Sequence, residues 1–312
     1  MFMSKQYTAS NTLKIGTRGS PLALVQARET RALLMAAHDM PEDAFEIRVI
    51  QTTGDAIQDR SLSEIGGKGL FTKEIQAELL SGEIDIAVHS MKDVANVLPD
   101  GLVLSTVLPR EDVRDAFISV KYNSIDELPF GATVGSSSLR RRAQLAAMRP
   151  DLKLVEFRGN VQTRLRKLDE GVADATFLAC AGLQRLGRWE IANPIAVEQM
   201  LPAVAQGAIA IEQRIDDEAI SAMLAPINHA ESKLRVSAER AFLRVLDGSC
   251  RTPIGGLALL DGDKLEFRGE VLRPDGSRVF NGVWHGDASD AEAIGAAAGE
   301  ELKARGGEGF FD

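Results

Sequence analysis

The stretch IDIAVHSMKDV, residues 84–94, changes character halfway along its length. Apolar residues alternate from Ile84 to Val88, as a half-buried β-strand requires, and the polar run HSMKD follows at once. Ligands of open α/β sheets bind beyond the carboxyl ends of the strands, so Lys92 and Asp93 are candidate site residues. A solvated loop with an ordinary ion pair would contain the same residues.

The residues before this stretch predict a parallel α/β unit. Strands are expected at 14–17 and 46–52, and helices at about 22–37 and 71–80. Ser20 is expected to cap the first helix, with Pro21 at its first position. The free amides of that turn and the nearby Arg18 would suit an anion, although capping alone explains Ser20.

A second series of strands and helices follows the segment PREDVRD, residues 109–115. Strands are expected at 116–120, 131–135, 152–157 and 174–180. A helix is expected over 136–151, a loop and helix over 159–168, and a further helix at 181–188. The segment at 208–213 reads as a strand that rejoins one of the earlier sheets. Two successive α/β units predict two similar lobes with a small-ligand cleft between them.

The last part of the chain predicts a small α+β domain. A helix is expected at 230–246, followed by strands at 257–260, 264–272 and 278–284 and a final helix at 290–304. The sequence PDG at 274–276 predicts the hairpin turn between the last two strands.

Composition excludes some classes of function. The chain has 312 residues with a net charge of -9, which argues against a general nucleic-acid binder, and only 5% are aromatic. Residues 1–12 lack the pattern of a secretory signal, and no apolar run approaches the roughly 20 residues of a membrane span. We therefore expect a cytoplasmic protein, in which Cys180 and Cys250 do not form a disulfide.

Positive charge is concentrated in residues 136–188. This segment holds nine arginines, two lysines and five acidic residues, a net charge of +6 (11 minus 5). A solvated helical face with intrachain salt bridges would explain single members. Arg140, Arg158, Arg164 and Arg185 together favour an anion site, because each follows a strand or opens a helix and guanidinium groups grip carboxylates or phosphates with two hydrogen bonds.

The two cysteines have different surroundings. Cys180 ends an apolar strand and is expected as a small buried residue. Cys250 lies in the glycine-rich segment GSCRTPIGG, so it is expected to be accessible, and the adjacent Arg251 would favour its thiolate form. Three interpretations of Cys250 stay open: a nucleophile, an anchor for a bound group, or a residue without a role. The loop GGKGLF with Lys68 is a mobile lid or a long connection, and it lacks the ending of a P-loop. No spacing indicates a metal site.

Several motifs together resemble the porphobilinogen deaminase family. They are GTRGSPLALVQA, AVHSMKDV, GSSSLRRRAQL, RGNVQTRLRKL, AGLQRLG, LPAVAQGA and ERAFLRVLDGSCRTPIGG, in this order along nearly the whole chain. The resemblance implies an α/β fold with two periplasmic-binding-protein-like lobes that contain mixed sheets, and a small α+β C-terminal domain. The implied domains are 1–108 with 208–227, 109–207, and 228–312.

The resemblance also implies an activity. The family is a transferase of porphyrin and heme biosynthesis that condenses four porphobilinogen molecules into the linear tetrapyrrole hydroxymethylbilane, with release of ammonia. A dipyrromethane cofactor, bound through a thioether to a cysteine that matches Cys250, primes the reaction. A cytoplasmic monomer is implied, with porphobilinogen as its ligand and a transient hand-over to the next enzyme of the pathway.

Family roles are carried over by position. Asp93 matches the catalytic carboxylate, which would stabilise the azafulvene cation formed when the amine leaves and would then accept a proton. The cofactor would be bound by Cys250, Lys92, Ser90, Ser138, Arg140, Arg141, Arg164 and Arg185. The substrate would be bound by Arg18, Ser20, Arg158, Lys68 and Gln26, although Gln26 has an equal claim as a polar residue on a helix face.

The chain departs from the family pattern at four positions. Many members have a lysine in place of Glu64, a proline in place of Ala95, and glycines in place of Ala205 and Ser249. No group that the reaction needs is lost, so these differences bear on loop mobility and rates. A non-catalytic two-lobed binding protein for an anionic small molecule is the main alternative, and an enzyme acting on phosphate esters is a weaker one.

Overall fold

The computed structural model describes residues 7–56, 69–248, 252–307 and 309–310 of the chain. Among these, residues 7–56, 69–110 and 208–233 form one compact unit, and residues 111–207 with 234–310 form a second. The predictions for Glu64, Lys68, Ser249, Cys250 and Arg251 concern residues outside the described ranges. The predicted division into three domains stays a prediction.

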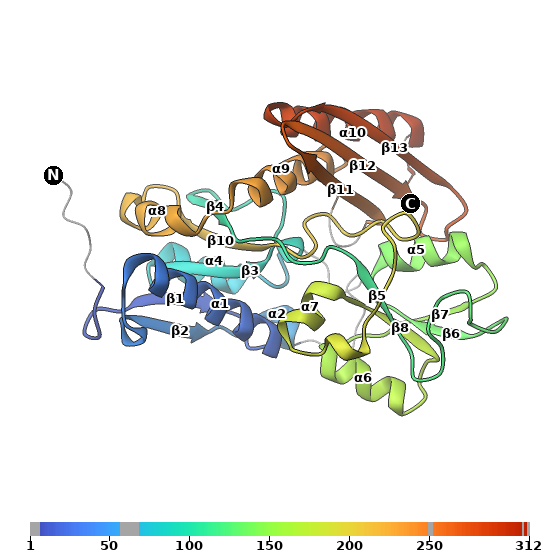
Figure 1. The fold of residues 1–312 in the computed structure, drawn as a ribbon, viewed down its shortest axis with the longest axis horizontal. Helices are drawn as coiled ribbons and strands as arrows, with labels where there is room; N and C mark the ends of the chain where they lie inside the picture. The colour runs from blue at the N-terminus through green and yellow to red at the C-terminus, as the bar shows by residue number, and fades with distance from the viewer. Residues whose placement is uncertain (1–6, 57–68, 249–251, 308, 311–312) are drawn as a thin grey trace. The chain divides into compact units, whose positions relative to one another are not determined.

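A five-stranded mixed sheet forms the centre of the first unit, in the order β2-β1-β3-β10-β4 (Figure 1). Its strands are β1 (Leu13–Thr17), β2 (Phe45–Val49), β3 (Ile86–Ser90), β4 (Leu102–Val107) and β10 (Ile209–Arg214). β1 pairs in parallel with β2 and β3, whereas β10 pairs antiparallel with β3 and β4. The carboxyl ends of β1, β2 and β3 therefore share one edge, and the strand expected at 208–213 rejoins the first sheet.

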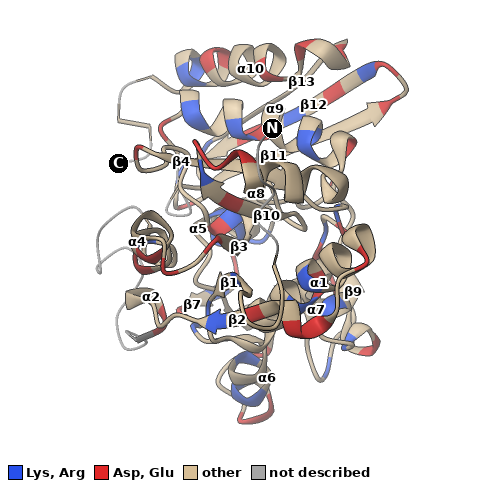
Figure 2. Ribbon diagram, turned by 90° about the vertical axis from the view of Figure 1, so that its left-hand side faces the viewer, with Lys and Arg blue, Asp and Glu red and all other residues tan. Residues whose placement is uncertain are grey.

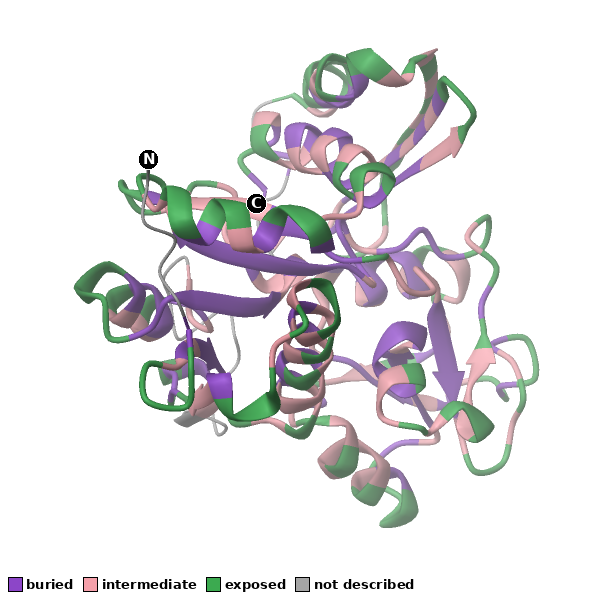
Figure 3. Ribbon diagram, turned by 60° about the vertical axis from the view of Figure 1, so that its left-hand side comes forward, coloured by how far each residue is buried: buried purple, intermediate pink, exposed green. Residues whose placement is uncertain are grey.

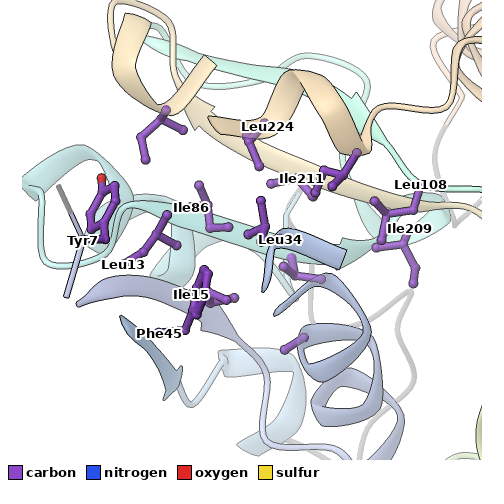
Figure 4. Close-up of a cluster of buried hydrophobic side chains, with 14 of the residues drawn as sticks. Tyr7, Leu13, Ile15, Leu34, Phe45, Ile86, Leu108, Ile209, Ile211 and Leu224 are labelled. Atoms are coloured by element: carbon purple, nitrogen blue, oxygen red, sulfur yellow. The ribbon is translucent and has the colours of Figure 1, made fainter. Parts of the chain in front are cut away.

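Helices cover both faces of this sheet. They are α1 (Pro21–His38), α2 (Thr53–Ala56), α4 (Lys73–Ser81), α8 (Glu218–Leu224), and the 3-10 turns Glu42–Ala44, Met91–Asp93 and Ala225–Ile227. Leu34 of α1 and Leu224 of α8 pack with Ile86 on one face (Figure 4), and Ile75 of α4 packs with Ala87 on the other. The half-buried strand expected from alternation is wrong, because β3 is a central strand covered on both sides.

The second unit contains a five-stranded sheet with the same pattern, in the order β7-β6-β8-β5-β9. Its strands are β5 (Asp115–Ile118), β6 (Thr133–Gly135), β7 (Lys153–Val155), β8 (Ala175–Ala179) and β9 (Asn193–Pro194), and its helices are α5 (Leu139–Met148), α6 (Val161–Asp169), α7 (Cys180–Arg185) and the 3-10 turn Trp189–Ile191. β6 lies parallel between β7 and β8, and β5 is antiparallel to β8. The prediction of two similar α/β lobes is confirmed.

The second unit also contains an antiparallel sheet, β11-β12-β13, with two long helices. These elements are α9 (Ala230–Val245, whose first residues belong to the first unit), β11 (Ile254–Asp261), β12 (Lys264–Leu272), β13 (Val279–Asp287), the 3-10 turn Ala288–Asp290 and α10 (Ala291–Gly306). α10 approaches α9 closely at Gly295, where an added Cβ would overlap the backbone of Ala238. The predicted small α+β portion is confirmed. Figure 3 shows buried residues on its inner surfaces and exposed ones on α10.

Within the described residues, no helix is long and apolar enough to cross a membrane.

Candidate functional site

A small pocket of about 70 Å³ lies at the carboxyl edge of the first sheet. Five predicted site residues line this pocket: Arg18, Ser20, Gln26, Ser90 and Asp93. The other lining residues were not predicted; they are Leu22, Ala23, Phe71, Thr72, Val88 and His89. They come from the turn after β1, from α1, from the segment before α4 and from the end of β3. The tertiary fold thus brings together residues up to 75 positions apart in sequence, from Arg18 to Asp93.

The turn after β1 has the geometry that its sequence predicts. Ser20 caps α1, since its hydroxyl accepts a hydrogen bond from Ala23 N at 3.2 Å, and Pro21 occupies the first helical position. Further along α1, Gln26 is only 4% exposed and hydrogen-bonds to Ser90 Oγ at 2.9 Å. Gln26 therefore belongs to the pocket wall and not to a solvated helix face.

Asp93 lies in the 3-10 turn Met91–Asp93 that follows β3, with its side chain 31% exposed. Its Oδ2 is 3.8 Å from Nη1 of Arg18. At this distance the two groups attract each other electrostatically without a hydrogen bond. Lys92, in the same turn, is partly buried. Asp93 is thus a partly exposed carboxylate at the pocket. The nearby cation, Arg18, makes its hydrogen bonds to a different carboxylate, Asp55.

Arg18 donates two hydrogen bonds to Asp55, which follows β2. Burial opposes the charge of Arg18, but its hydrogen bonds to Asp55 and the nearby charge of Asp93 raise its pKa above the ordinary value. Burial likewise opposes ionisation of Asp55, and the contacts from Arg18 outweigh it and lower the pKa of Asp55. Sequence reasoning missed Asp55, although it follows a strand of the same sheet edge as Asp93 and the same rule would have found it.

A buried polar network lies behind the pocket. His89 Nε2 is 3.1 Å from Oε2 of Glu212, and Gln76 Nε2 donates to Oε1 of Glu212 at 2.8 Å. The Glu212 side chain has no exposed surface, and it lies on β10 where the pairing with β4 is irregular. Burying a carboxylate is unfavourable unless it is hydrogen-bonded, and both oxygens have partners here. Nothing local in the sequence around Glu212 pointed to this network.

The carboxyl edge of the second sheet carries a buried ion cluster. Asp115 contacts Arg140 Nη1 at 2.8 Å and Arg141 Nη2 at 2.6 Å, and both arginines are at most 5% exposed. Burial would raise the pKa of Asp115, but the two guanidinium charges outweigh it and hold that pKa well below its ordinary value. Arg140 and Arg141 carry two positive charges and Asp115 carries one negative charge. The three residues together therefore have a net charge of about +1.

Arg140 also links this cluster to the antiparallel sheet. Its Nη1 donates to Gln144 at 3.0 Å and to the carbonyl of Leu201 at 2.8 Å, and Gln144 donates to Glu270 on β12 at 2.7 Å. Burial raises the pKa of Glu270, and the hydrogen bond from Gln144 only partly offsets this. The Nε of Arg140 is buried without a hydrogen-bond partner among the described residues.

The other arginines of segment 136–188 divide into two groups. Four arginines form intrachain ion pairs, as the solvated-face alternative expects: Arg142 with Glu156, Arg149 with Asp151, Arg166 with Glu170 and Arg188 with Glu190. Figure 2 shows positive residues along α6 and negative residues at its end. The residues that match family roles lie elsewhere, beyond the carboxyl ends of the parallel strands β6, β7 and β8: Ser138, Arg158, Arg164 and Arg185.

These residues also have structural contacts. Ser138 caps α5 by accepting from Arg141 N at 3.4 Å, Arg164 Nε donates to Gly159 O at 2.9 Å, and Arg185 Nη1 donates to Gly207 O at 3.1 Å. Near Gly207, Ala205 adopts a left-handed backbone with φ of 59°, a conformation that glycine adopts without strain. This explains why a glycine suits the position.

Cys180 is fully buried, as predicted, but it is the first residue of α7 and not the last residue of the preceding strand. Burial raises the pKa of its thiol to about 12, so Cys180 is not a nucleophile near neutral pH. The chemistry proposed for Cys250 concerns a residue outside the described ranges.

Comparison with known proteins gives a consistent result. The family model "Porphobilinogen deaminase, dipyromethane cofactor binding domain" matches residues 13–222, and "Porphobilinogen deaminase, C-terminal domain" matches residues 233–304. The chain is 61% identical over 311 residues to a porphobilinogen deaminase of Paracoccus denitrificans, covering 99% of both chains. It is 55% identical over 298 residues to one of Nitrobacter winogradskyi, covering 95% of this chain and 94% of the relative.

Solved structures show weaker likeness. A putative methionine-binding lipoprotein of Bacillus subtilis has a TM-score of 0.41 at 13% identity, over 72% of this chain and 94% of the other. The periplasmic VFT2 domain of BvgS from Bordetella pertussis has a TM-score of 0.40 at 17% identity, over 69% and 86%. Similarity at this level carries no argument about the present chain.

Proposed function

The chain belongs to the porphobilinogen deaminase family, and from that membership we propose how its own residues carry the reaction. Its activity is accordingly that of a hydroxymethylbilane-forming transferase, which condenses four porphobilinogen molecules into a linear tetrapyrrole and releases ammonia at each step. The observation that carries the assignment of roles is the pocket in which Asp93 lies beside Arg18 at the carboxyl edge of the first sheet. The alternative of a non-catalytic binding protein is not favoured.

Asp93 is proposed as the catalytic carboxylate. Loss of the amine from porphobilinogen leaves positive charge on the substrate, and a fixed carboxylate at the pocket stabilises that charge as it develops. The same oxygen atoms then accept the proton that the condensation releases. Its half-exposed position supports this role, because Asp93 can meet a ligand, whereas the carboxylate of Asp115 is fully committed inside the protein.

Arg18, Ser20, Gln26, Arg158 and Lys68 are proposed to bind the substrate. Porphobilinogen carries an acetate and a propionate, which require hydrogen-bond donors and positive charge. The position of Arg18, Ser20 and Gln26 around the pocket of Asp93 supports their share of this role. Arg158 follows β7 in the other sheet, and Lys68 lies outside the described residues.

Dipyrromethane is the family's cofactor, and it supplies the primer to which substrate units are added. The donor set fits a group that bears several carboxylates, because Arg140 and Arg141 exceed the charge of Asp115 and Arg140 retains a buried, unpartnered Nε. We propose that Cys250 anchors the cofactor. The carboxylate side chains of the cofactor would be held by Lys92, Ser90, Ser138, Arg140, Arg141, Arg164 and Arg185.

The remaining expectations are also proposals. The sequence resemblance supports a cytoplasmic, monomeric enzyme, and the reactivity of a linear tetrapyrrole supports a transient hand-over to the enzyme that consumes it.

The test of the catalytic role is the variant Asp93→Asn. We expect it to fold and to retain the covalent mass of the cofactor but to turn over porphobilinogen at least about a hundredfold more slowly, since an amide neither stabilises a cation nor accepts the proton. Ammonia release measures turnover, and intact mass under denaturing conditions measures cofactor loading. A rate within twofold of the wild type would remove Asp93 from the mechanism.

Two further variants serve as controls in the same experiment. Asp100→Asn changes an exposed carboxylate a few residues beyond the pocket and should leave the rate unchanged. Cys250→Ser should lose both the added mass of two pyrrole units and the activity. A Cys250→Ser protein that still carries the added mass would place the anchor elsewhere.

A further inference from the structure

Arg18 lies between two carboxylates, and it presents a different part of its guanidinium to each. The Nε and Nη2 atoms donate to Oδ2 and Oδ1 of Asp55, with the Nε bond at 3.0 Å. Nη1 faces Oδ2 of Asp93 at 3.8 Å, which is too long for a hydrogen bond. The two-donor edge of Arg18 is therefore occupied by Asp55, and only Nη1 is directed toward Asp93.

This arrangement is fixed from two further directions. Thr52, which is 1% exposed, donates its hydroxyl to Oδ2 of Asp55 at 2.8 Å. The ring of Phe71 lies 4.2 Å from the centre of the Arg18 guanidinium, within the range of a cation–π contact. Arg18 is thus held along one edge by Asp55 and on one face by Phe71.

The electrostatic consequence concerns Asp93. A guanidinium group near two carboxylates pairs with the one that offers two parallel hydrogen bonds, because such pairs are the strongest. Without the charge of Asp55, Arg18 would have Asp93 as its nearest carboxylate and would close the 3.8 Å separation. An Asp93 paired in this way would be less able to stabilise a positive charge on a substrate or to accept a proton.

We propose that Asp55 is a positioning residue for the reaction: it holds Arg18 away from direct pairing with Asp93 and so keeps the catalytic carboxylate free. This inference rests on the proposed role of Asp93. The trio of Arg18, Asp55 and Asp93 then carries a net negative charge, which suits the cationic end of an aminomethyl pyrrole. Asp55 itself need not contact the substrate.

The kinetic test compares Asp55→Asn with a matched variant in the cofactor-loaded enzyme. Arg149 and Asp151 form the same two-bond pair, with Nε and Nη2 each at 2.8 Å, and their side chains are 22% and 15% exposed, against 22% and 27% for Arg18 and Asp55. We expect Asp55→Asn to lower kcat by about tenfold to a hundredfold, the range caused by small misplacements of catalytic groups, and to change KM by less than about threefold. Asp151 precedes β7 and lies away from the carboxyl edge of its sheet. Asp151→Asn should therefore leave kcat within twofold of the wild-type value.

A double-mutant comparison separates positioning from a general structural effect. If Asp55 acts through Arg18, then Asp55→Asn combined with Arg18→Gln should be no slower than Arg18→Gln alone. If instead the fold-loss of kcat in the double variant equals the product of the two single-variant losses, Asp55 acts independently of Arg18 and the proposal is overturned. A kcat for Asp55→Asn within twofold of the wild type would overturn it as well.

A second measurement does not depend on turnover. In the cofactor-loaded protein without substrate, the Nε–H of Arg18 should give a slowly exchanging NMR signal, which Asp55→Asn abolishes and Asp151→Asn preserves. An Arg18 signal that survives in Asp55→Asn would overturn the positioning role whatever the kinetics show. A wild-type protein that fails to consume porphobilinogen would instead overturn the proposed function, and the Arg18 signal would still decide the role of Asp55.

Discussion

Asp39 and Gly82 end helices α1 and α4 in the same backbone conformation with different residues. Both are left-handed, with φ of 50° at Asp39 and 79° at Gly82. A side chain in this conformation costs roughly 1–2 kcal/mol, and a carboxylate at a helix C-terminus costs about 0.3–1 kcal/mol more. Glycine avoids both costs but loses about 0.4–1 kcal/mol of chain entropy on folding.

The left-handed conformation and the negative charge of Asp39 make this helix end a site where glycine should be more stable. Asp39→Gly should raise the free energy of unfolding of the first unit by about 1 kcal/mol, because the relief of strain and charge exceeds the entropy lost. Urea unfolding, followed by hydrogen exchange of the amides in α1, measures the change.

The reverse substitution is the matched control. Gly82→Asp should lower the stability by about the same amount, since no atom lies within 4 Å of the added Cβ and backbone strain decides the result. Equal effects of the same sign in the two variants would contradict the strain argument.

Helix α9 joins two other segments of the second unit through one buried side chain. Glu239 has no exposed surface, and its carboxylate accepts hydrogen bonds from Ala205 N at 2.6 Å and from Ala258 N at 2.9 Å. Ala205 belongs to the LPAVAQG segment and Ala258 to β11. A backbone N–H left buried without a partner costs about 1–3 kcal/mol, so the two bonds together matter for this part of the fold.

We predict that Glu239→Ala lowers the free energy of unfolding of the second unit by at least about 2 kcal/mol, with Glu239→Gln intermediate because the amide retains one acceptor. The amides of Ala205 and Ala258 should exchange faster with solvent in both variants. Glu300→Gln changes an exposed carboxylate on α10 and should have no effect. Unchanged exchange at Ala205 and Ala258 would contradict the bridging role.

Element boundaries show where local patterns were insufficient. The sequence places the start of the first C-terminal strand at 257, but β11 begins at Ile254 and includes Gly255 and Gly256. Glycine is a poor strand former by local preference. Here glycine is favoured by a close approach, because a Cβ on Gly255 would lie only 3.2 Å from Leu201 and Gly256 N donates to Pro202 O.

At the scale of the whole molecule, ion pairs between arginines and carboxylates set the response to acid, and the Asp115 pair is the buried one among them. The pKa values of Asp55, Asp112, Asp115 and Asp151 are all lowered by arginine partners in the folded state. A carboxyl group whose pKa is lower when folded contributes stability above its unfolded value and loses it as the pH falls toward the folded value. Glu270 has the opposite sign, since its raised pKa contributes stability that is lost as the pH rises.

We predict that the free energy of unfolding falls steeply below about pH 4, near the ordinary carboxyl value of 3.8, with Asp115 as a main contributor. Asp115→Asn should be destabilised by about 3–5 kcal/mol at neutral pH, because Arg140 and Arg141 lose their buried partner, and its stability should vary less with pH. Urea midpoints measured from pH 6 to pH 2 give both quantities.

The control for this experiment is Asp216→Asn, a change at an exposed carboxyl in the turn before α8. Its urea midpoints should follow those of the wild type at every pH. A pH profile of Asp115→Asn as steep as that of the wild type would assign the acid response to other groups.

The sequence alone determined the features that depend on neighbours a few residues apart. The cap Ser20, the succession of strands and helices in both lobes, the hairpin at 274–276 and the burial of Cys180 all follow from local periodicity and from the preferences of individual residues. The match of several motifs to one family added the activity, which no single pattern contained.

Only the tertiary structure decided which charged groups meet. Arg18 and Asp55 are 37 residues apart, and Arg141 and Asp115 are 26 apart, so neither pair has a local signature. The sequence left each arginine of the RRR run open between a solvated helical face and an anion site. Two of these arginines are instead buried around Asp115, because the order of strands in the sheet brings β5 beside the start of that helix. An ion pair depends on distance in space, and distance in space is set by the packing of elements that are distant in sequence.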